Sequence, residues 1–301
     1  MILECKQIAD NTLNNVKMKV EELKAKGIEP SLALVRVLGD DASAVYVGRK
    51  ESACKECNLK TQTIELPNDV TMEEIQKIIY NLNRDRNINA IMLQLPLPEH
   101  LDERDLLGAI APTKDADCLN YASIGLMMTN DDIVQPCTPK GVMKVLKENN
   151  IELEGKNVLV INRSLLVGKP LVELLQRENA TVTLAHSRTR NLFNLIERSD
   201  VIITAVGKKN FITEEQINSL TELNKSLDRH QYIVDVSINV DEQGKLNGDV
   251  ALNNKANRDF IDNLPNISIT PVPGGIGLTT VACLLENTIE LTELQLEMNN
   301  K

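Results

Sequence analysis

Residues 157–170 have the sequence Asn-Val-Leu-Val-Ile-Asn-Arg-Ser-Leu-Leu-Val-Gly-Lys-Pro, which sets the fold class of the second half of the chain. The apolar start, Asn157–Ile161, predicts a buried strand, and Pro170 predicts the start of a helix that runs to Glu178. In the turn between them, free backbone N–H groups and the helix dipole would face a phosphate. Asn162 stands where dinucleotide-binding turns have a first glycine, and Asn tolerates a positive φ. A purely structural strand–turn–helix unit would look similar.

Strands and helices alternate on both sides of this stretch. The apolar periodicity predicts a helix over 142–149 before it, and strands over 181–185, 200–205 and 232–236 with a helix over 192–198 after it. Continuous apolar strands joined by amphipathic helices are typical of a parallel sheet that is covered on both faces. The second half is therefore predicted to be a Rossmann-type α/β unit.

The first half of the chain shows the same alternation. Helices are predicted over 5–26, 43–57 and 71–83, the last with a Thr71-x-x-Glu74 start, and strands over 31–38, 61–66 and 90–95. The Pro-rich segment 135–141 separates the halves, and the apolar segment 279–294 predicts a final long helix. We therefore expect an α/β protein with two α/β domains. Residues 1–138 plus 271–301 would form one domain, to which the C-terminal helix returns, and residues 139–270 a Rossmann-type dinucleotide-binding domain.

The composition excludes several classes of protein. Lys and Arg total 33 and Asp and Glu total 43, a net charge of −10 that argues against binding to nucleic acid or an anionic membrane. Glu4 and Lys6 interrupt the apolar run of a signal peptide, and three prolines break the uncharged stretch 263–285, so neither secretion nor a membrane span is expected. Six scattered cysteines indicate reduced thiols and a cytoplasmic location. Cys54 and Cys57 form a C-x-x-C pair without further ligands, so we interpret them as small apolar helix residues and expect no metal site.

The residues after the 181–185 strand bear on the choice of cofactor. An NAD-preferring fold places an acidic side chain about 20 residues after the glycine turn, but no Asp or Glu lies between Glu178 and Glu197. Ser187 and Arg188 follow the strand instead, and Arg163 lies in the first turn. Because cationic and hydroxyl groups suit a 2′-phosphate, the sequence favours NADP over NAD. We interpret His186 as a polar residue at the strand end rather than as a catalyst.

Three polar residues in the first half share one predicted helix face. Ser43, Tyr46 and Lys50 are spaced i, i+3 and i+7. A lysine at such a position is most often a solvated surface charge. However, Gln94 ends a predicted strand and Asp117 follows in a Pro-Thr-Lys-Asp-Ala-Asp segment, and ligands of open parallel sheets bind at the carboxyl ends of strands. These side chains can therefore converge on one site.

Six motifs occur in order along nearly the whole chain. They are Ser43…Tyr46…Lys50, Gln94-Leu-Pro-Leu-Pro98, Lys114-Asp-Ala-Asp117, Pro136-Cys-Thr-Pro139, Arg163-Ser…Val167-Gly168-Lys-Pro170 and Thr270-Pro-Val-Pro-Gly-Gly275. Together they resemble the bifunctional methylenetetrahydrofolate dehydrogenase/methenyltetrahydrofolate cyclohydrolase family. The resemblance implies NADP-dependent oxidation of 5,10-methylenetetrahydrofolate, then hydrolysis of the methenyl product to 10-formyltetrahydrofolate, at a cleft between the domains.

The resemblance also implies roles for individual residues. Lys50 would be the acid/base group of the hydrolytic step, held by Gln94, while Tyr46 would stack on the folate and Asp117 would bind the pterin's N–H donors. A lysine base needs a pKa well below its ordinary value, and a desolvated pocket beside a cationic intermediate lowers it. The remaining implied ligands are Ser43, Pro271, Gly274 and Gly275 for the substrate and Asn162, Arg163, Ser164, Gly168, Ser187 and Ile238 for the dinucleotide. The resemblance further implies a homodimer.

The chain departs from the family pattern at four positions. Cys118, Asn162 and Ser237 stand where the family usually has glycine, and Leu278 stands where it often has proline. Side chains near ligand loops could narrow the space for substrate or nicotinamide. Two other interpretations are therefore considered: a single-activity NAD(P)-dependent methylenetetrahydrofolate dehydrogenase, and a non-catalytic folate- or dinucleotide-binding protein. The presence of Lys50 argues against the second.

Overall fold

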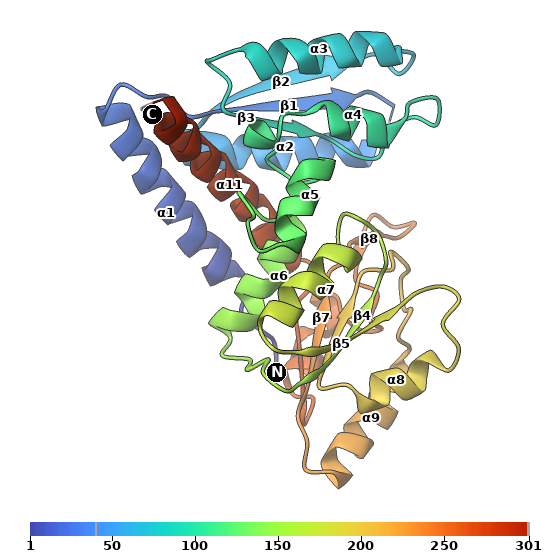
Figure 1. Ribbon diagram of the computed structural model, residues 1–301. Coiled ribbons are helices and arrows are strands. Elements are labelled where there is room, and N and C mark those ends of the chain that lie inside the picture. The colour runs from blue at the N-terminus through green and yellow to red at the C-terminus, as the bar shows by residue number, and fades with distance from the viewer. Residues whose placement is uncertain (40, 300–301) are drawn as a thin grey trace. The chain divides into compact units, whose positions relative to one another are not determined.

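The computed structural model describes residues 1–39 and 41–299, without the side chains of 41–44 and 256. The chain forms two compact units, each built on its own sheet (Figure 1). Unit 1 comprises Met1–Ala9 and Thr138–Thr280, and unit 2 comprises Asp10–Cys137 and Val281–Lys301. The two α/β folds expected from the periodicity are present.

Unit 2 contains a parallel sheet in the order β2-β1-β3. Its strands are β1 (Ser31–Val37), β2 (Lys60–Leu66) and β3 (Ala90–Leu93). The crossover helices are α2 (Asp41–Glu56) and α3 (Met72–Arg84). Thr71 caps α3 through the predicted Thr-x-x-Glu box, in which Thr71 and Glu74 bind each other's backbone N–H groups.

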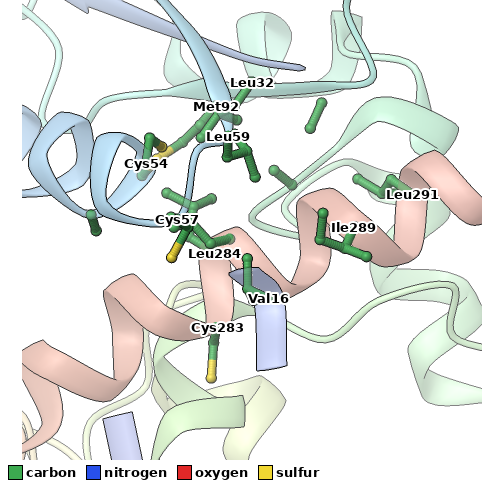
Figure 2. Packing of buried hydrophobic residues seen from close by; sticks show 14 of the residues in the cluster. Val16, Leu32, Cys54, Cys57, Leu59, Met92, Cys283, Leu284, Ile289 and Leu291 are labelled. Carbon is green, nitrogen blue, oxygen red and sulfur yellow. The ribbon is translucent and has the colours of Figure 1, made fainter. Parts of the chain in front are cut away.

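Both faces of this sheet are covered, which explains why its strands are continuously apolar. Leu32, Leu34 and Met92 point to the face that packs against α2, α1 (Lys6–Ala25) and the C-terminal helix α11 (Ile276–Asn299), and Figure 2 shows this core. Ala33 and Val35 point to the opposite face, against α3. Cys54 and Cys57 lie in the first core as buried free thiols, in agreement with their interpretation as apolar helix residues.

A polar segment follows β3 and leads to the site. It contains α4 (Glu103–Ala109), a 3-10 turn (Pro112–Lys114) and α5 (Tyr121–Met128), of which the two helices were not predicted. The ammonium group of Lys114 donates to the backbone oxygens of Leu82 (2.9 Å) and Asp85 (2.7 Å) at the end of α3. This lysine therefore caps a helix and fixes the start of the segment that carries Asp117.

Unit 1 contains a parallel sheet in the order β10-β7-β6-β4-β5. The strands are β4 (Asn157–Ile161), β5 (Thr181–Ala185), β6 (Val201–Thr204), β7 (Gln231–Asp235) and β10 (Ile267–Ile269). The helices are α6 (Cys137–Glu148), α7 (Gly168–Arg177), α8 (Leu192–Arg198), α9 (Glu214–Ser226) and α10 (Arg258–Asp262). α6 and α7 cover one face and α8, α9 and α10 the other. The chain passes from β4 to β5 on one side and then to β6 on the other, so β4 marks the switch point of a Rossmann-type sheet.

Three features of unit 1 differ from the expectations. The short antiparallel pair β8 (Asn239–Val240) and β9 (Leu246–Asn247), together with α9, α10 and β10, was not predicted. Residues 1–9 belong to this unit because Ile269, the last residue of β10, accepts a backbone hydrogen bond from Leu3 and donates one to Met1. Unit 1 also continues to Thr280 rather than ending at 270. Among the described residues, no helix has the length and apolarity needed to cross a bilayer.

Candidate active site

The central contact of unit 2 joins Lys50 on α2 to Gln94 at the end of β3. The Nζ of Lys50 donates to the Oε1 of Gln94 at 2.7 Å, and the two residues are only 6% and 9% exposed. The Nε2 of Gln94 donates to the backbone oxygen of Leu95 (2.6 Å), which directs the amide oxygen toward the lysine. Lys50 is therefore a buried amine, not the solvated surface charge that its helix spacing alone favours.

Asp117 supplies the opposite charge. Burial lowers the pKa of Lys50, and the carboxylate of Asp117 opposes this by favouring the ammonium form. Burial likewise raises the pKa of Asp117, and the charge of Lys50 opposes it. Each group thus stabilises the charged form of the other in surroundings that favour the neutral form of both. Because its pKa is lowered, this amine can lose its proton at a lower pH than an exposed lysine, as a general base requires.

The position of Asp117 depends on two residues to which the sequence analysis assigned no role. The backbone N–H of Cys137 donates to Oδ1 of Asp117 (3.3 Å), and its thiol donates to the oxygen of Ala116 (3.3 Å). Asn287, a fully buried residue of α11, donates to the oxygens of Ala116 (2.9 Å) and Gln135 (2.8 Å). Two features of the sequence could have pointed to these residues. Cys137 lies in the Pro-Cys-Thr-Pro motif, and Asn287 is a lone asparagine in an apolar helix.

The other predicted substrate residue on α2 is Tyr46. Tyr46 is half-buried, four residues before Lys50 and on the same helix face. The guanidinium carbon of Arg49 lies 6.0 Å from the Tyr46 ring centroid. The side chain of Ser43 lies outside the described residues.

In unit 1, Asn162 organises the turn after β4. Its Oδ1 accepts from the N–H groups of Ser164 (2.7 Å) and Gly168 (3.2 Å), and its Nδ2 donates to the oxygen of Ala205 (2.6 Å). Asn162 does not take a positive φ, so its amide side chain, rather than a left-handed backbone, shapes the turn. The N–H of Gly168 is therefore occupied by Asn162, and the exposed residues of the turn include Leu165 and Leu166.

Gly168 is required at the start of α7 by close packing. A Cβ there would lie 2.1 Å from the oxygen and 2.4 Å from the carbonyl carbon of Asn162, both backbone atoms. Gly275, in the loop after β10, is required for the same reason, because a Cβ there would lie 2.2 Å from the backbone oxygen of Pro271. Gly274 has a φ of +96°, which glycine adopts without strain. Arg258 of α10 donates to the oxygen of Pro273 and so holds this loop.

The turn after β5 carries the polar groups predicted to face a 2′-phosphate. Ser187 and Arg188 are exposed, as is Arg163 in the turn after β4. The N–H of Arg188 donates to Nδ1 of His186 (3.1 Å), and Thr189 closes the turn by accepting from the N–H of His186 (2.9 Å). His186 therefore shapes the turn, consistent with its interpretation as a strand-end polar residue.

Comparison with known proteins identifies both units. Residues 3–117 match the catalytic domain, and residues 136–296 the NAD(P)-binding domain, of the tetrahydrofolate dehydrogenase/cyclohydrolase family. The chain belongs to this family. It is a bifunctional dehydrogenase and cyclohydrolase of one-carbon folate metabolism, with an NAD(P)-binding domain and tetrahydrofolate derivatives as substrates. The resemblance that the six motifs indicated is confirmed.

The relatives span the full length of the chain. The bifunctional protein FolD of Lachnoclostridium phytofermentans is 39% identical over 290 residues, which is 96% of each chain. The crystal structure of the bifunctional FolD enzyme of Campylobacter jejuni superimposes with a TM-score of 0.88 at 34% identity, covering 98% of this chain and 99% of that one. The Trypanosoma brucei enzyme, whose structure is complexed with NADP cofactor and an inhibitor, has a TM-score of 0.86 at 30% identity and 98% coverage of both chains.

The positions at which this family member departs from the pattern each have local contacts. Cys118 has a φ of +55° and its side chain is buried in the core of unit 2, away from solvent. Asn162 caps the turn, as described above. Ser237 donates to Asp249, and Leu278 is 39% exposed on α11. Ile238, next to Ser237, lies against α11, because a Cβ on Gly277 would be 3.0 Å from its Cδ1.

Proposed function

We propose that the chain oxidises 5,10-methylenetetrahydrofolate with NADP⁺ and hydrolyses the methenyl product to 10-formyltetrahydrofolate, with Lys50, Gln94 and Asp117 at the folate. The observation that carries the assignment of residues is the buried 2.7 Å contact between Lys50 and Gln94. A buried amine with a lowered pKa is costly for a site that only binds, whereas a general base needs it. A dehydrogenase without hydrolytic activity, or a protein that only binds folate or dinucleotide, would not need this contact.

In the hydrolytic step, the neutral amine of Lys50 accepts a proton from the water that attacks the methenyl carbon. The C–O bond forms and the positive charge of the amidinium is neutralised. N5 then takes the proton from the Lys50 ammonium, the bond from this carbon to N5 breaks, and the hydroxyl loses its proton to water as the C=O bond of the N10-formyl group forms. Gln94 holds the amine in position throughout, because its amide oxygen is the acceptor of the lysine's hydrogen bond.

In this proposal, the carboxylate of Asp117 accepts hydrogen bonds from the N–H groups of the pterin. The backbone N–H of Cys137 fixes the carboxylate, so two acceptor oxygens face a flat ring with amino and ring N–H groups. Tyr46 supplies an aromatic face for stacking, and Pro271, Gly274 and Gly275 are proposed as further substrate ligands from the family resemblance. Ser43 is proposed as a further substrate contact from its position on α2.

The dinucleotide binds along the carboxyl ends of the unit 1 strands, and when bound it accepts a hydride from the folate. Asn162, Arg163, Ser164 and Gly168 form the turn at β4, the strand at which the order reverses, where such ligands bind in open α/β sheets. Because Asn162 occupies the N–H of Gly168, a phosphate would bind at the exposed residues of the turn and be attracted by the dipole at the N-terminus of α7. The further contacts are Ser187 after β5 and Ile238 after β7.

We propose NADP as the preferred dinucleotide. Arg163, Ser187 and Arg188 are exposed on the two turns beside β4, and no carboxylate lies between Glu178 and Glu197 to bind a ribose 2′-hydroxyl. A 2′-phosphate is therefore attracted, and a bare hydroxyl lacks its usual partner.

The proposal extends to a cytoplasmic homodimer. Among the described residues, all six cysteines are buried and none forms a disulfide bond, which fits a reducing compartment. β2 pairs with β1 and forms an edge of the unit 2 sheet, and an edge strand is a surface to which a second copy can add. Sedimentation of the purified protein tests this part independently of activity.

One assay tests the proposed reactions. The purified protein is incubated with methylenetetrahydrofolate and either NADP⁺ or NAD⁺, and reduced nicotinamide and methenyltetrahydrofolate are followed by absorbance. We expect reduced nicotinamide without persistent methenyl product, and a higher rate with NADP⁺. Reduced cofactor with accumulating methenyl product would indicate a dehydrogenase alone. Neither signal, with ligand still bound, would indicate a binding protein.

A further inference from the structure

Asp249 is a buried carboxylate to which donors from separate segments of unit 1 converge. It is 0% exposed and follows β9. Its Oδ2 accepts from the hydroxyl of Thr204 at the end of β6 (2.8 Å) and from the N–H of Val206 (2.6 Å). Its Oδ1 accepts from the N–H of Lys208 (2.9 Å). The carboxylate therefore fixes the loop that follows β6 from its beginning to its middle.

The same carboxylate also holds the loop that follows β7. The hydroxyl of Ser237 donates to Oδ2 of Asp249 at 2.9 Å, and Nδ2 of Asn239 donates to Oδ1 at 3.3 Å. Asp235, at the end of β7, completes the arrangement by accepting from the N–H groups of Asp249 (3.1 Å) and Val250 (3.0 Å). Asp249 is thus itself held in place by the strand that precedes the second loop.

Ser237 joins the two loops to each other as well as to Asp249. While its hydroxyl donates to the carboxylate, its oxygen accepts from the N–H of Gly207 at 3.0 Å. Gly207 has a φ of +72°, the conformation that turns the loop after β6. A chain of hydrogen bonds therefore runs from Gly207 through Ser237 to Asp249, and its middle link is the single hydroxyl of Ser237.

The place of these loops in the sheet indicates which part of a dinucleotide they face. β6 and β7 lie on one side of β4, and β5 lies on the other. The turn after β5 carries Ser187 and Arg188, the groups proposed for the 2′-phosphate, so the adenosine half belongs on that side. The nicotinamide half therefore belongs on the other side of β4, beside the loops after β6 and β7.

We propose that Ser237 is a positioning residue for the nicotinamide half of the dinucleotide, because its hydroxyl holds the loops 205–210 and 236–239 together before the cofactor binds. This inference rests on the proposed binding of NADP to unit 1. A loop that is already ordered does not have to be ordered by the ligand, so the hydroxyl increases affinity without touching the cofactor.

The experiment compares Ser237→Ala and Ser237→Gly with the wild-type enzyme by calorimetric titration. The probes are NADP⁺ and adenosine 2′,5′-bisphosphate, which has the 2′-phosphate but no nicotinamide. Loss of one hydrogen-bond link predicts a Kd for NADP⁺ about 5- to 15-fold higher in both variants. The Kd for adenosine 2′,5′-bisphosphate is expected to change less than about twofold, and the KM for NADP⁺ to rise more than kcat falls.

Ser219→Ala provides a matched control. Ser219 lies on the exposed face of α9, and its hydroxyl donates to the oxygen of Glu215 (3.0 Å). The control is expected to bind both probes as the wild type does, because this hydroxyl contacts neither loop.

Three results would overturn the inference. An unchanged Kd for NADP⁺ in Ser237→Ala would show that the hydroxyl does not order the loops. Equal losses for both probes would indicate a general structural role. A loss confined to Ser237→Gly would assign the effect to backbone flexibility. Failure of the wild-type enzyme to bind either probe would instead overturn the proposed function, and so is distinguishable from the other results.

Discussion

The two units bury charged groups for opposite purposes. In unit 2, the ammonium of Lys50 has a single neutral acceptor, Gln94, at 2.7 Å and an electrostatic partner in Asp117. In unit 1, the carboxylate of Asp249 accepts from backbone N–H, hydroxyl and amide donors in two loops. A buried amine with few hydrogen bonds can exchange a proton, whereas a carboxylate that accepts hydrogen bonds from two loops holds those loops together.

This difference also separates the kinds of residue that matter in each unit. Unit 2 depends on the chemistry of side chains, so replacing one reactive atom should abolish a step. Unit 1 depends on the shape of loops and on backbone N–H groups, so the effects of substitutions should come through packing and affinity. The following variants test that contrast, beginning with the largest expected effect and ending with the smallest.

Lys50→Met should have the largest effect, because it removes the amine and keeps much of its volume. Hydrolysis of supplied methenyltetrahydrofolate is expected to slow by about 10²- to 10⁴-fold, the usual contribution of a general base. Dehydrogenase activity should fall much less, since hydride transfer needs alignment rather than a base. Lys55→Met, on the same helix but exposed, is the control. Near-normal hydrolysis in Lys50→Met would remove this residue from the mechanism.

Gly168→Ala tests whether unit 1 depends on close packing at the start of α7. The added Cβ would overlap backbone atoms of Asn162, and overpacking of this kind costs about 1–3 kcal/mol. We expect a lower free energy of unfolding and an at least tenfold higher Kd for NADP⁺, measured by denaturant titration and calorimetry.

Gly125→Ala is the control for Gly168→Ala. Gly125 lies within α5, and a Cβ there has no neighbour within 4 Å. It should stabilise the helix by up to about 1 kcal/mol. If Gly168→Ala had as little effect on NADP⁺ binding as Gly125→Ala, the proposed turn would not be the phosphate site.

Gln94→Glu tests the protonation state of Lys50 through pH dependence. Because the pKa of Lys50 is lowered by burial, hydrolysis in the wild type should rise with pH up to that pKa and then level off. A carboxylate at Gln94 would favour the ammonium form and raise the pKa of Lys50. The rate profile should therefore move about 1–2 pH units upward, with a fall of about 10- to 100-fold at pH values below the wild-type pKa of Lys50. A profile that keeps its midpoint would contradict the assigned base.

Arg188→Ser should have the smallest effect, because an exposed ion pair contributes at most about 1 kcal/mol. The ratio of kcat/KM for NADP⁺ to that for NAD⁺ is expected to fall about fivefold, mainly through the KM for NADP⁺. Arg198→Ser, at the exposed end of α8, should leave the ratio unchanged. An unchanged ratio in Arg188→Ser would show that groups other than Arg188 bind the 2′-phosphate.

Several expectations from the sequence could be made because they depend on neighbouring residues. The apolar runs at 157–161 and 181–185 predicted β4 and β5 with the bounds observed, and Thr71 with Glu74 predicted the start of α3. The helix α9 was missed although Thr213 and Gln216 form a capping box of the same kind. β8 and β9 have two residues each, too few for any periodicity to appear.

The sequence by itself determined the α/β class, the parallel strands and the family, because periodicity and ordered motifs are local properties that survive without a fold. Only the tertiary structure decided which polar side chains are buried and what they meet. By its spacing, Lys50 resembles any lysine on a helix surface, yet its side chain is buried and the residue is only 6% exposed. Asn287 donates to a backbone oxygen that lies 171 residues away in the sequence. Burial and long-range hydrogen bonds arise when distant segments exclude water together, so no window along the chain contains them.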